Sequence, residues 1–164
     1  MDLIDEGVLV KPIYRPHFVH DLNLANIDIS SGDFPIEKLS NAIIRSSMID
    51  YAIWSYKEER SKLAADPISA WFCADISVAE ATLSAIEQCG VEAAIVTAKT
   101  PIKERMKLLC LHEAGEMEAI VSVGVLAEGW VNPNCNIIVH LRPTLSKVLW
   151  GQSVGRGLRS APGK

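Results

Sequence analysis

The chain has 164 residues, of which 49% are hydrophobic and 22% charged, and its formal net charge is −4. This length fits one domain with a sizeable core, and no segment approaches the ~20 uninterrupted apolar residues of a membrane-spanning helix. The acidic balance excludes a protein whose whole surface binds nucleic acid, although residues 142–164 contain five basic residues and no acid. The first residues are acidic where a secretory signal is basic, so we expect a cytoplasmic protein with no membrane partner.

The N-terminal part of the chain predicts a connector. Val8–Arg15 has the pattern of an extended strand. The mostly polar residues 18–34 predict a loop, in which Asp33 is placed to cap the next helix. That helix is expected over Ile36–Arg60, with a break near Ser46–Ser47.

Residues 63–164 predict an α/β domain that follows a connector over residues 1–62. Four short segments rich in Ile, Val and Ala lack clean alternation, as strands buried on both faces do; they are Ser69–Ala74, Glu92–Thr97, Met117–Val123 and Asn136–Leu141. Helical stretches, Val78–Gln88 and Ile102–His112, separate the first three. This alternation predicts a parallel sheet flanked by helices.

Capping residues mark where these helices begin and end. Ser77 and Glu80 have the spacing of a capping box, and Thr100 stands directly before a first-turn Pro101. Gly115 is expected to end the second helix.

The sharpest chemical pattern lies near the end of the chain, after a helix expected to start near Ser146. Arg156 and Arg159 are three residues apart, so on a helical turn both guanidiniums would leave the same face. A guanidinium forks two hydrogen bonds onto phosphate oxygens, and Gly155 and Gly157 leave room for another surface to approach. Spacing alone leaves open a solvated basic helix.

Segments in a fixed order resemble the motifs of superfamily 2 helicases, in the group related to the XPB-type and type III restriction ATPases. They are Ala70–Glu80 (motif IV), Thr100–Arg105 with Gly115–Glu116 (the stretch before motif V), Ser122–Pro133 (motif V) and Gln152–Arg159 (motif VI, Q-x-x-G-R-x-x-R). The resemblance implies the second, C-terminal RecA-like domain of such an enzyme. Its fold is a P-loop-NTPase-like parallel sheet in three α/β/α layers, here with an N-terminal extension.

The resemblance also implies an ATP site shared between two RecA-like domains of one polypeptide, with ATP and Mg²⁺ bound mainly by the first. By similarity, Arg156 and Arg159 would contact the γ-phosphate as the catalytic arginines. Gln152 would help to set their position, and Gly129 and Gly155 would lie at the nucleotide and the domain interface. No metal site is expected in this chain, because its four cysteines stand singly.

A DNA or RNA strand is the second partner that the resemblance implies. Ser122, Thr100 and the helix start after Ala74 would face its phosphates, since hydroxyls and helix N-termini bind phosphate oxygens. Trp130 is a candidate for stacking on a base. Trp71, in a buried strand, is expected in the core.

The chain departs from the family in motif V and lacks the first domain. Val131 stands at the usual aspartate position, which removes a carboxylate contact, and Asn132 is expected to point the other way. A P-loop before Gly163–Lys164 would need glycine where Leu158 stands. We therefore expect a fragment, cut before Met1 and after motif VI, that does not hydrolyse ATP by itself.

An ATP-dependent helicase or translocase is thus the leading hypothesis. The alternative is a non-catalytic nucleic-acid-binding or regulatory module with the same fold, and a flavodoxin-like enzyme lacks support because no glycine-rich phosphate loop is present. His112–Glu116 resembles the zinc motif His-Glu-x-x-His, but its fifth residue is glutamate and Gly115 would end the helix. A helix end at the surface is therefore predicted for His112.

Overall fold

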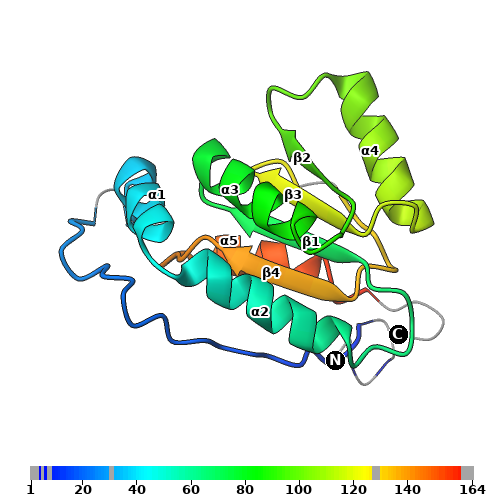
Figure 1. Cartoon of the computed structure of the whole chain (residues 1–164), viewed down its shortest axis with the longest axis horizontal. Helices are drawn as coiled ribbons and strands as arrows, with labels where there is room; N and C mark the ends of the chain where they lie inside the picture. Colours follow the sequence, from blue (N-terminus) through cyan, green and yellow to red (C-terminus); the bar gives the residue numbers. More distant parts are fainter. Residues whose placement is uncertain (1–3, 5, 7–8, 30–31, 127–129, 160–164) are drawn as a thin grey trace.

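The computed structural model describes residues 4, 6, 9–29, 32–126 and 130–159. Helices and strands alternate over most of this length (Figure 1). In chain order they are α1 (Ile36–Arg45), α2 (Met48–Arg60), β1 (Ser69–Cys73), α3 (Ile76–Glu87), β2 (Ala93–Thr97), α4 (Ile102–Ala114), β3 (Ala119–Val123), β4 (Ile137–Leu141) and α5 (Lys147–Gly155).

The four strands form one parallel sheet in the order β2-β3-β1-β4. Every residue of β1 is buried, and so is every residue of β3 except the last, as expected for the two middle strands. Each strand coincides with one of the predicted apolar segments to within two residues, so the α/β class is confirmed. Because the strands are parallel, their carboxyl ends all lie at one end of the sheet and their amino ends at the other.

Helices cover both faces of the sheet. α1, α2 and α3 lie in front of it in Figure 1, and α5 lies behind it. On the face opposite α3, Leu108 and Leu111 of α4 pack with Val96 of β2 and Ile120 of β3. The predicted three-layer α/β/α arrangement is therefore confirmed.

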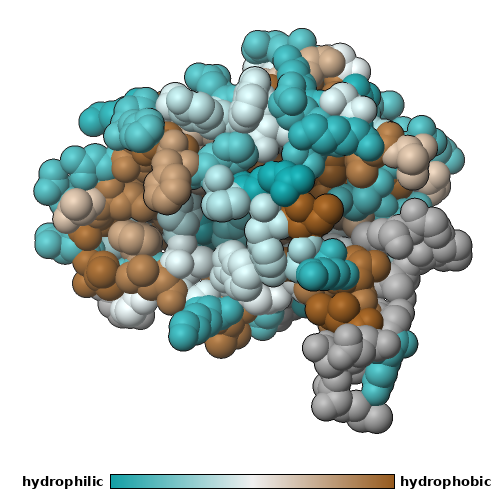
Figure 2. Space-filling view, turned by 90° about the horizontal axis from the view of Figure 1, so that it is seen from below, coloured by the Kyte–Doolittle hydropathy of each residue, from teal (hydrophilic) through white to brown (hydrophobic). Residues whose placement is uncertain are grey.

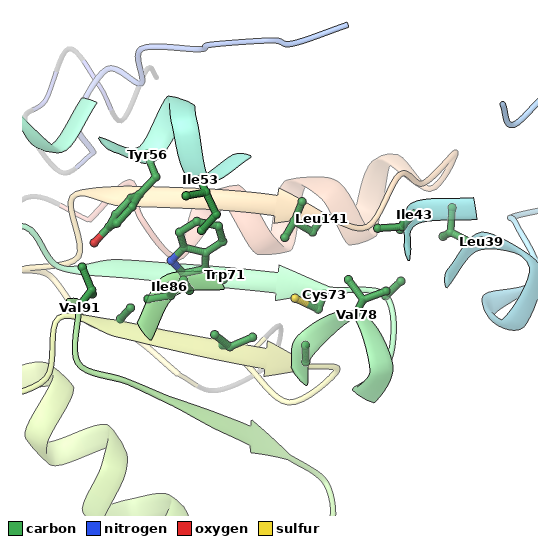
Figure 3. Packing of buried hydrophobic residues seen from close by; sticks show 14 residues of the cluster. Leu39, Ile43, Ile53, Tyr56, Trp71, Cys73, Val78, Ile86, Val91 and Leu141 are labelled. Carbon is green, nitrogen blue, oxygen red and sulfur yellow. The ribbon is translucent and has the colours of Figure 1, made fainter. Parts of the chain in front are cut away.

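The core on the front face joins α1 and α2 to the strands. Figure 3 shows Tyr56 and Ile53 of α2 pointing toward Trp71 of β1. The rings of Tyr56 and Trp71 meet edge to face, with centroids 5.1 Å apart, and Trp71 is fully buried as expected. The Tyr56 hydroxyl donates to Glu118, which also accepts two hydrogen bonds from Arg60, at 2.6 and 2.8 Å. The core thus continues across the predicted division after residue 62, and that division stays a prediction.

The N-terminal segment does not form the predicted strand. Residues 10–19 have no regular structure, Leu9 makes an isolated antiparallel bridge with Arg159, and Val8 lies outside the described residues. Pro12 and Pro16 explain the difference, because proline has no N–H to donate to a neighbouring strand. The predicted break in the following helix is confirmed, since α1 and α2 are separate helices.

Helices α1, α3 and α4 begin differently from the prediction. Asp75, not Ser77, caps α3, and its carboxylate accepts from the main-chain N–H three residues on at 3.0 Å and from Ser77 Oγ at 2.8 Å. Thr100 does not cap α4, because its Oγ1 accepts from Thr97 N at 2.9 Å. Asp33 does not cap α1 but accepts hydrogen bonds from the loop before α5. In each case the predicted side chain is hydrogen-bonded to another group nearby.

The surface along the N-terminal segment is divided between apolar and polar residues. Figure 2 views the molecule from this side and shows separate apolar patches with hydrophilic residues between them. Phe18 and Ile13 are among the exposed apolar side chains of this segment. Within the described part of the chain, no helix has the length and apolar character that crossing a membrane requires.

Replacing Tyr56 by alanine tests whether α2 belongs to the same cooperative unit as the sheet. We expect Tyr56→Ala to lower the free energy of unfolding by about 3 kcal/mol or more, because it removes a large ring from the core. Tyr51 of α2 is 40% exposed, so Tyr51→Ala is the matched control and should change stability by less than ~1 kcal/mol. Urea unfolding followed by circular dichroism measures both. A main transition unchanged in Tyr56→Ala would instead support an independent connector.

Candidate functional site

The motif VI segment lies on α5 and on the turn that follows it. The Ser146 side chain begins the helix as predicted, accepting from the main-chain N–H three residues on at 3.3 Å. The helix ends at Gly155, and the following hydrogen bonds join residues three apart, as in a tightened last turn. Arg156 keeps helical dihedral angles, whereas Arg159 is already in the bridge with Leu9. The prediction that both guanidiniums leave one helical face is therefore wrong.

Gly157 allows this turn to lie directly on β4. A Cβ atom at Gly157 would come within 2.5 Å of Ile138 Cγ1, whereas a Cβ at Gly155 would meet nothing within 4 Å. The close approach expected at these glycines thus occurs at Gly157, and the approaching surface is the chain's own sheet.

Arg156 connects the motif VI turn to the motif V segment. Its side chain is half-buried, and its Nη1 donates to the carbonyl oxygen of Trp130 at 3.0 Å. Trp130 directly follows Gly129, which lies outside the described residues. Gln152 is exposed one helical turn before Arg156, so the two share a side of α5. The structure thus brings together two segments, 26 residues apart, that the sequence assigns to one ATP site.

Trp130 is not placed to stack on a base. Only 8% of its surface is exposed, and its ring lies beside that of His112, with centroids 5.8 Å apart. A ring enclosed in this way has no open face for a nucleobase. The predicted nucleic-acid contact by Trp130 does not agree with this burial.

The other predicted nucleic-acid contacts lie at the carboxyl end of the sheet. Ala74 and Ser122 are buried, with 4% and 1% exposed, and Ser122 Oγ accepts from Leu126 N at 3.2 Å. The start of α3 already holds the Asp75 carboxylate as its cap, and this charge would repel a phosphate. Burial thus argues against Ala74 and Ser122, whereas Thr100 is half-buried and keeps some accessible surface.

A buried pair, His112 and Asn132, lies behind the contact between Arg156 and Trp130. Both residues are 0% exposed, so the predicted surface location of His112 is wrong. His112 Nε2 lies 2.9 Å from Ser69 O, and its Nδ1 lies 3.1 Å from Asn132 Nδ2. Since a carbonyl oxygen only accepts, Nε2 carries the proton and Nδ1 accepts from the amide. The imidazole is therefore neutral with both nitrogens hydrogen-bonded.

Sequence reasoning missed this pair because its signal is weak. α4 shows no clear apolar face that would mark His112 as buried, and Asn132 was expected to lie on a strand. The segment after Trp130 is instead a turn, in which Cys135 N donates to Asn132 O at 3.1 Å. An Asn-Pro-Asn sequence, which favours a turn, is the feature that could have indicated it.

The two predicted sites lie at opposite ends of the sheet. Ser69, which binds His112, is the first residue of β1, and Ile138, which contacts the turn after α5, is the second of β4. Thr100, by contrast, follows the carboxyl end of β2. Strands of five residues separate these ends by roughly 15 Å.

Burial of His112 generates a prediction about pH. Burial lowers the pKa of His112 from 6.5 to about 4, an effect opposed by its hydrogen bond to Ser69. Below pH 6.5 the unfolded chain takes up this proton and the folded chain does not, so stability should fall as the pH drops from 6.5 toward 4. The loss attributable to His112 is at most ~3 kcal/mol.

Urea unfolding at several pH values measures this loss, with two histidine variants for comparison. His112→Gln should weaken the dependence on pH between 6.5 and 4, while His20→Gln, which alters an exposed histidine, should leave it as it is. An identical pH dependence in His112→Gln and the unchanged chain would contradict the assignment of a neutral buried imidazole.

The fit of Gly157 against β4 generates a second prediction. Gly157→Ala should cost about 1–3 kcal/mol of unfolding free energy, because its new methyl group overlaps Ile138. Gly155→Ala is the control, and it should be neutral or stabilising by up to ~1 kcal/mol, since the site is helical and open. Ile138→Ala combined with Gly157→Ala should then cost less than the sum of the two. Equal stability of the two glycine variants would contradict the close packing.

The chain is similar in sequence to known proteins. No family model matches the chain. It is 24% identical over 146 residues to a 51.5 kDa protein of a Lactococcus phage, and 25% identical over 162 residues to IRC3, a proposed ATP-dependent helicase of Saccharomyces cerevisiae. These matches cover 89% and 97% of the chain, but only 31% and 23% of the relatives. The chain thus spans about a third or less of their length.

Solved structures with a similar fold are parts of helicases and related ATPases. The Hef helicase domain of Pyrococcus furiosus has a TM-score of 0.53 at 18% identity, covering 68% of this chain and 23% of that one. The C-terminal domain of the DEAD-box protein Dbp5 has a TM-score of 0.52 at 21% identity and is matched over 67% of both chains. The C-terminal part of the Fun30 ATPase domain has a TM-score of 0.57 at 12% identity, over 73% of this chain and 38% of that one. The sequence resemblance is thus confirmed at the level of the fold: the chain has the RecA-like α/β fold of superfamily 2 helicase C-terminal domains.

Proposed function

We propose that this chain is the second RecA-like domain of a superfamily 2 ATP-dependent helicase or translocase. ATP binds between it and a first RecA-like domain of the same polypeptide, and hydrolysis moves the pair along a nucleic-acid strand. The observation that carries the proposal is the hydrogen bond from Arg156 to Trp130 O, since it joins the motif V and motif VI segments at one place.

Arg156 and Arg159 supply positive charge to the γ-phosphate in this proposal. Charge spreads over the phosphate oxygens during transfer, and a guanidinium is always protonated and forks two hydrogen bonds. Arg156 is half-buried and held, whereas Arg159 is exposed beyond the helix. Gln152 lies on the same side of α5 as Arg156, and Gly155 leaves the surface between them open to the first domain. Gly129 keeps its proposed place near the nucleotide.

Mg²⁺ belongs to the first domain in this proposal. Within the described parts of the chain, no three His, Cys, Asp or Glu side chains come together in a way that could hold a metal ion. In this proposal the chain contributes arginines to an ATP site whose nucleotide is held mainly by the first domain. By itself it should not hydrolyse ATP.

A DNA or RNA strand binds near the carboxyl end of the sheet, with Thr100 as the remaining candidate contact of those named from the sequence. One structure with this fold, S. cerevisiae Dbp5, is bound to RNA and ADP BeF₃, with a TM-score of 0.55 at 20% identity over 66% of this chain and 29% of that one, which supports a nucleic-acid partner. Because contacts to phosphates carry little base information, we expect binding that depends on salt and hardly on sequence.

A non-catalytic nucleic-acid-binding or regulatory module is the second candidate, and Val131 favours it. The family has aspartate at this position, whereas Val131 presents an apolar side chain that is 37% exposed. No carboxylate is then available there to bind the nucleotide or motif VI. Measuring turnover decides between the two candidates.

Nucleic-acid-stimulated ATP hydrolysis by the protein that contains both domains is the test. Arg156→Ala and Arg159→Ala should each lower kcat about 10³-fold or more, as loss of an arginine finger does. Arg45→Ala, which removes an exposed arginine from α1, is the control and should leave kcat unchanged. Unchanged turnover in both arginine variants would defeat the assignment. Nucleic-acid binding without turnover in the unsubstituted protein would favour the non-catalytic module.

A further inference from the structure

We infer that Asn132 is a positioning residue for Arg156, acting through the main-chain carbonyl of Trp130. The inference rests on the proposed function, because it concerns how one of the two arginines is prepared for ATP. In this inference the buried, uncharged side-chain amide of Asn132 holds the motif V segment in place against the motif VI segment.

Asn132 is held on several sides within the core. Its Nδ2 donates to His112 Nδ1 at 3.1 Å and to His112 O at 3.3 Å, and its Oδ1 accepts from Asn134 N at 2.9 Å. The residue is 0% exposed. A buried amide with both its donor and its acceptor groups satisfied has one favoured orientation, because any rotation leaves polar atoms unpaired.

His112 holds the same segment at a second point. Its ring lies against Trp130 at a centroid distance of 5.8 Å, while its Nδ1 binds Asn132. The ring is itself fixed by Ser69 O at 2.9 Å, at the start of β1. Trp130 and Asn132 are only two positions apart, so two anchors on one imidazole leave the backbone between them little freedom.

The fixed backbone determines where the Trp130 carbonyl points. This oxygen accepts the hydrogen bond from Arg156 Nη1 at 3.0 Å. A guanidinium is planar and rigid, so a hydrogen bond from one terminal nitrogen restricts the movement of the whole group. Val131, between the two anchors, keeps its side chain at the surface. The carbonyl thus prepares Arg156 before ATP binds.

A prepared arginine should affect the chemical step more than the binding of ATP. A displacement of about 1 Å at a charge-stabilising group can cost up to ~10²-fold in rate. We therefore expect Asn132→Ala to lower kcat by roughly 10-fold to 100-fold while the KM for ATP changes by less than about threefold. If Asn132 had a purely structural role, the substitution would lower the amount of folded enzyme, and the kcat of the folded molecules would stay the same.

The first measurement uses the 164-residue chain and needs no ATP. Proton–nitrogen correlation spectra at low temperature report whether rotation of the Arg156 guanidinium is slowed by a hydrogen bond, and Arg156→Lys identifies the signal. We expect slow rotation in the unchanged chain and fast rotation in Asn132→Ala. Asn134→Ala is the matched control, since the exposed Asn134 side chain binds Glu113 O, at 3.3 Å, and not His112 or Trp130, and the guanidinium signal should remain.

Asn132→Leu is the second variant, in case the cavity left by the alanine substitution prevents folding. Leucine fills a similar volume, but it can neither donate to His112 nor accept a proton from it, so the restraint on the guanidinium should again weaken. A restrained Arg156 signal in a folded Asn132 variant would overturn the inference.

The second measurement is ATP hydrolysis by the protein with both domains. A lower kcat with an almost unchanged KM in the Asn132 variants, and neither change in Asn134→Ala, would support the inference. Equal changes in kcat for Asn132→Ala and Asn134→Ala would overturn it. Absence of turnover in the unsubstituted protein would overturn the proposed function, and with it the catalytic role of Asn132. The guanidinium signal would still report whether Asn132 positions Arg156 through Trp130 O.

Discussion

The buried imidazole of His112 joins three parts of the chain that are far apart in sequence. It binds the first residue of β1 through Nε2 and the end of the motif V segment through Nδ1, and it is itself part of α4. Both nitrogens of a neutral ring are thereby used, so an added proton would have to displace a hydrogen bond in the core. The turn at the end of motif V, and the carbonyl that Arg156 binds, depend on this ring staying neutral.

The parallel sheet decides how far apart the proposed partners lie. All four strands point the same way, so loops after the strands gather at one end while α5 returns the chain to the other. A nucleic-acid strand near Thr100 and an ATP near Arg156 would not touch each other. Under the proposed function, an effect of one on the other has to pass through the elements between them, chiefly α4, which begins near Thr100 and ends at His112's hydrogen bonds.

Sequence patterns predicted the sheet well because its strands are buried on both faces. Largely apolar segments of six or seven residues have few alternatives, and the four that were predicted contain β1 to β4. Helix caps were predicted less well, because Asp75, Ser77 and Thr100 all carry acceptors and only the folded backbone decides which one meets a free N–H. The strand expected at Val8–Arg15 needed a neighbour to pair with, and pairing is not visible in a local pattern.

The residue types of the candidate site could be predicted from the sequence, but the buried residues that hold them in place could not. Arg156 and Gln152 stand out because they fit the Q-x-x-G-R-x-x-R pattern of motif VI, which the chain resembles. Trp130 was a candidate for stacking because aromatic residues stack on bases in single-strand binders, and its burial depends on α4 and β3 being packed beneath it. His112 and Asn132 are 20 residues apart, and nothing in either neighbourhood points to the other.

The presence of an amide and not a carboxylate at position 132 has an electrostatic reason. A carboxylate at Asn132 would lie beside the lone pair of His112 Nδ1 and the carbonyl oxygen of the same residue, and both are electron-rich. Such a charge, buried at 0% exposure, would be tolerated only if the imidazole took up a proton, which burial already disfavours. An amide supplies two N–H groups to these acceptors without any charge. The buried position therefore suits asparagine, and loss of the family's aspartate at the exposed Val131 leaves this neutral support for Arg156 intact.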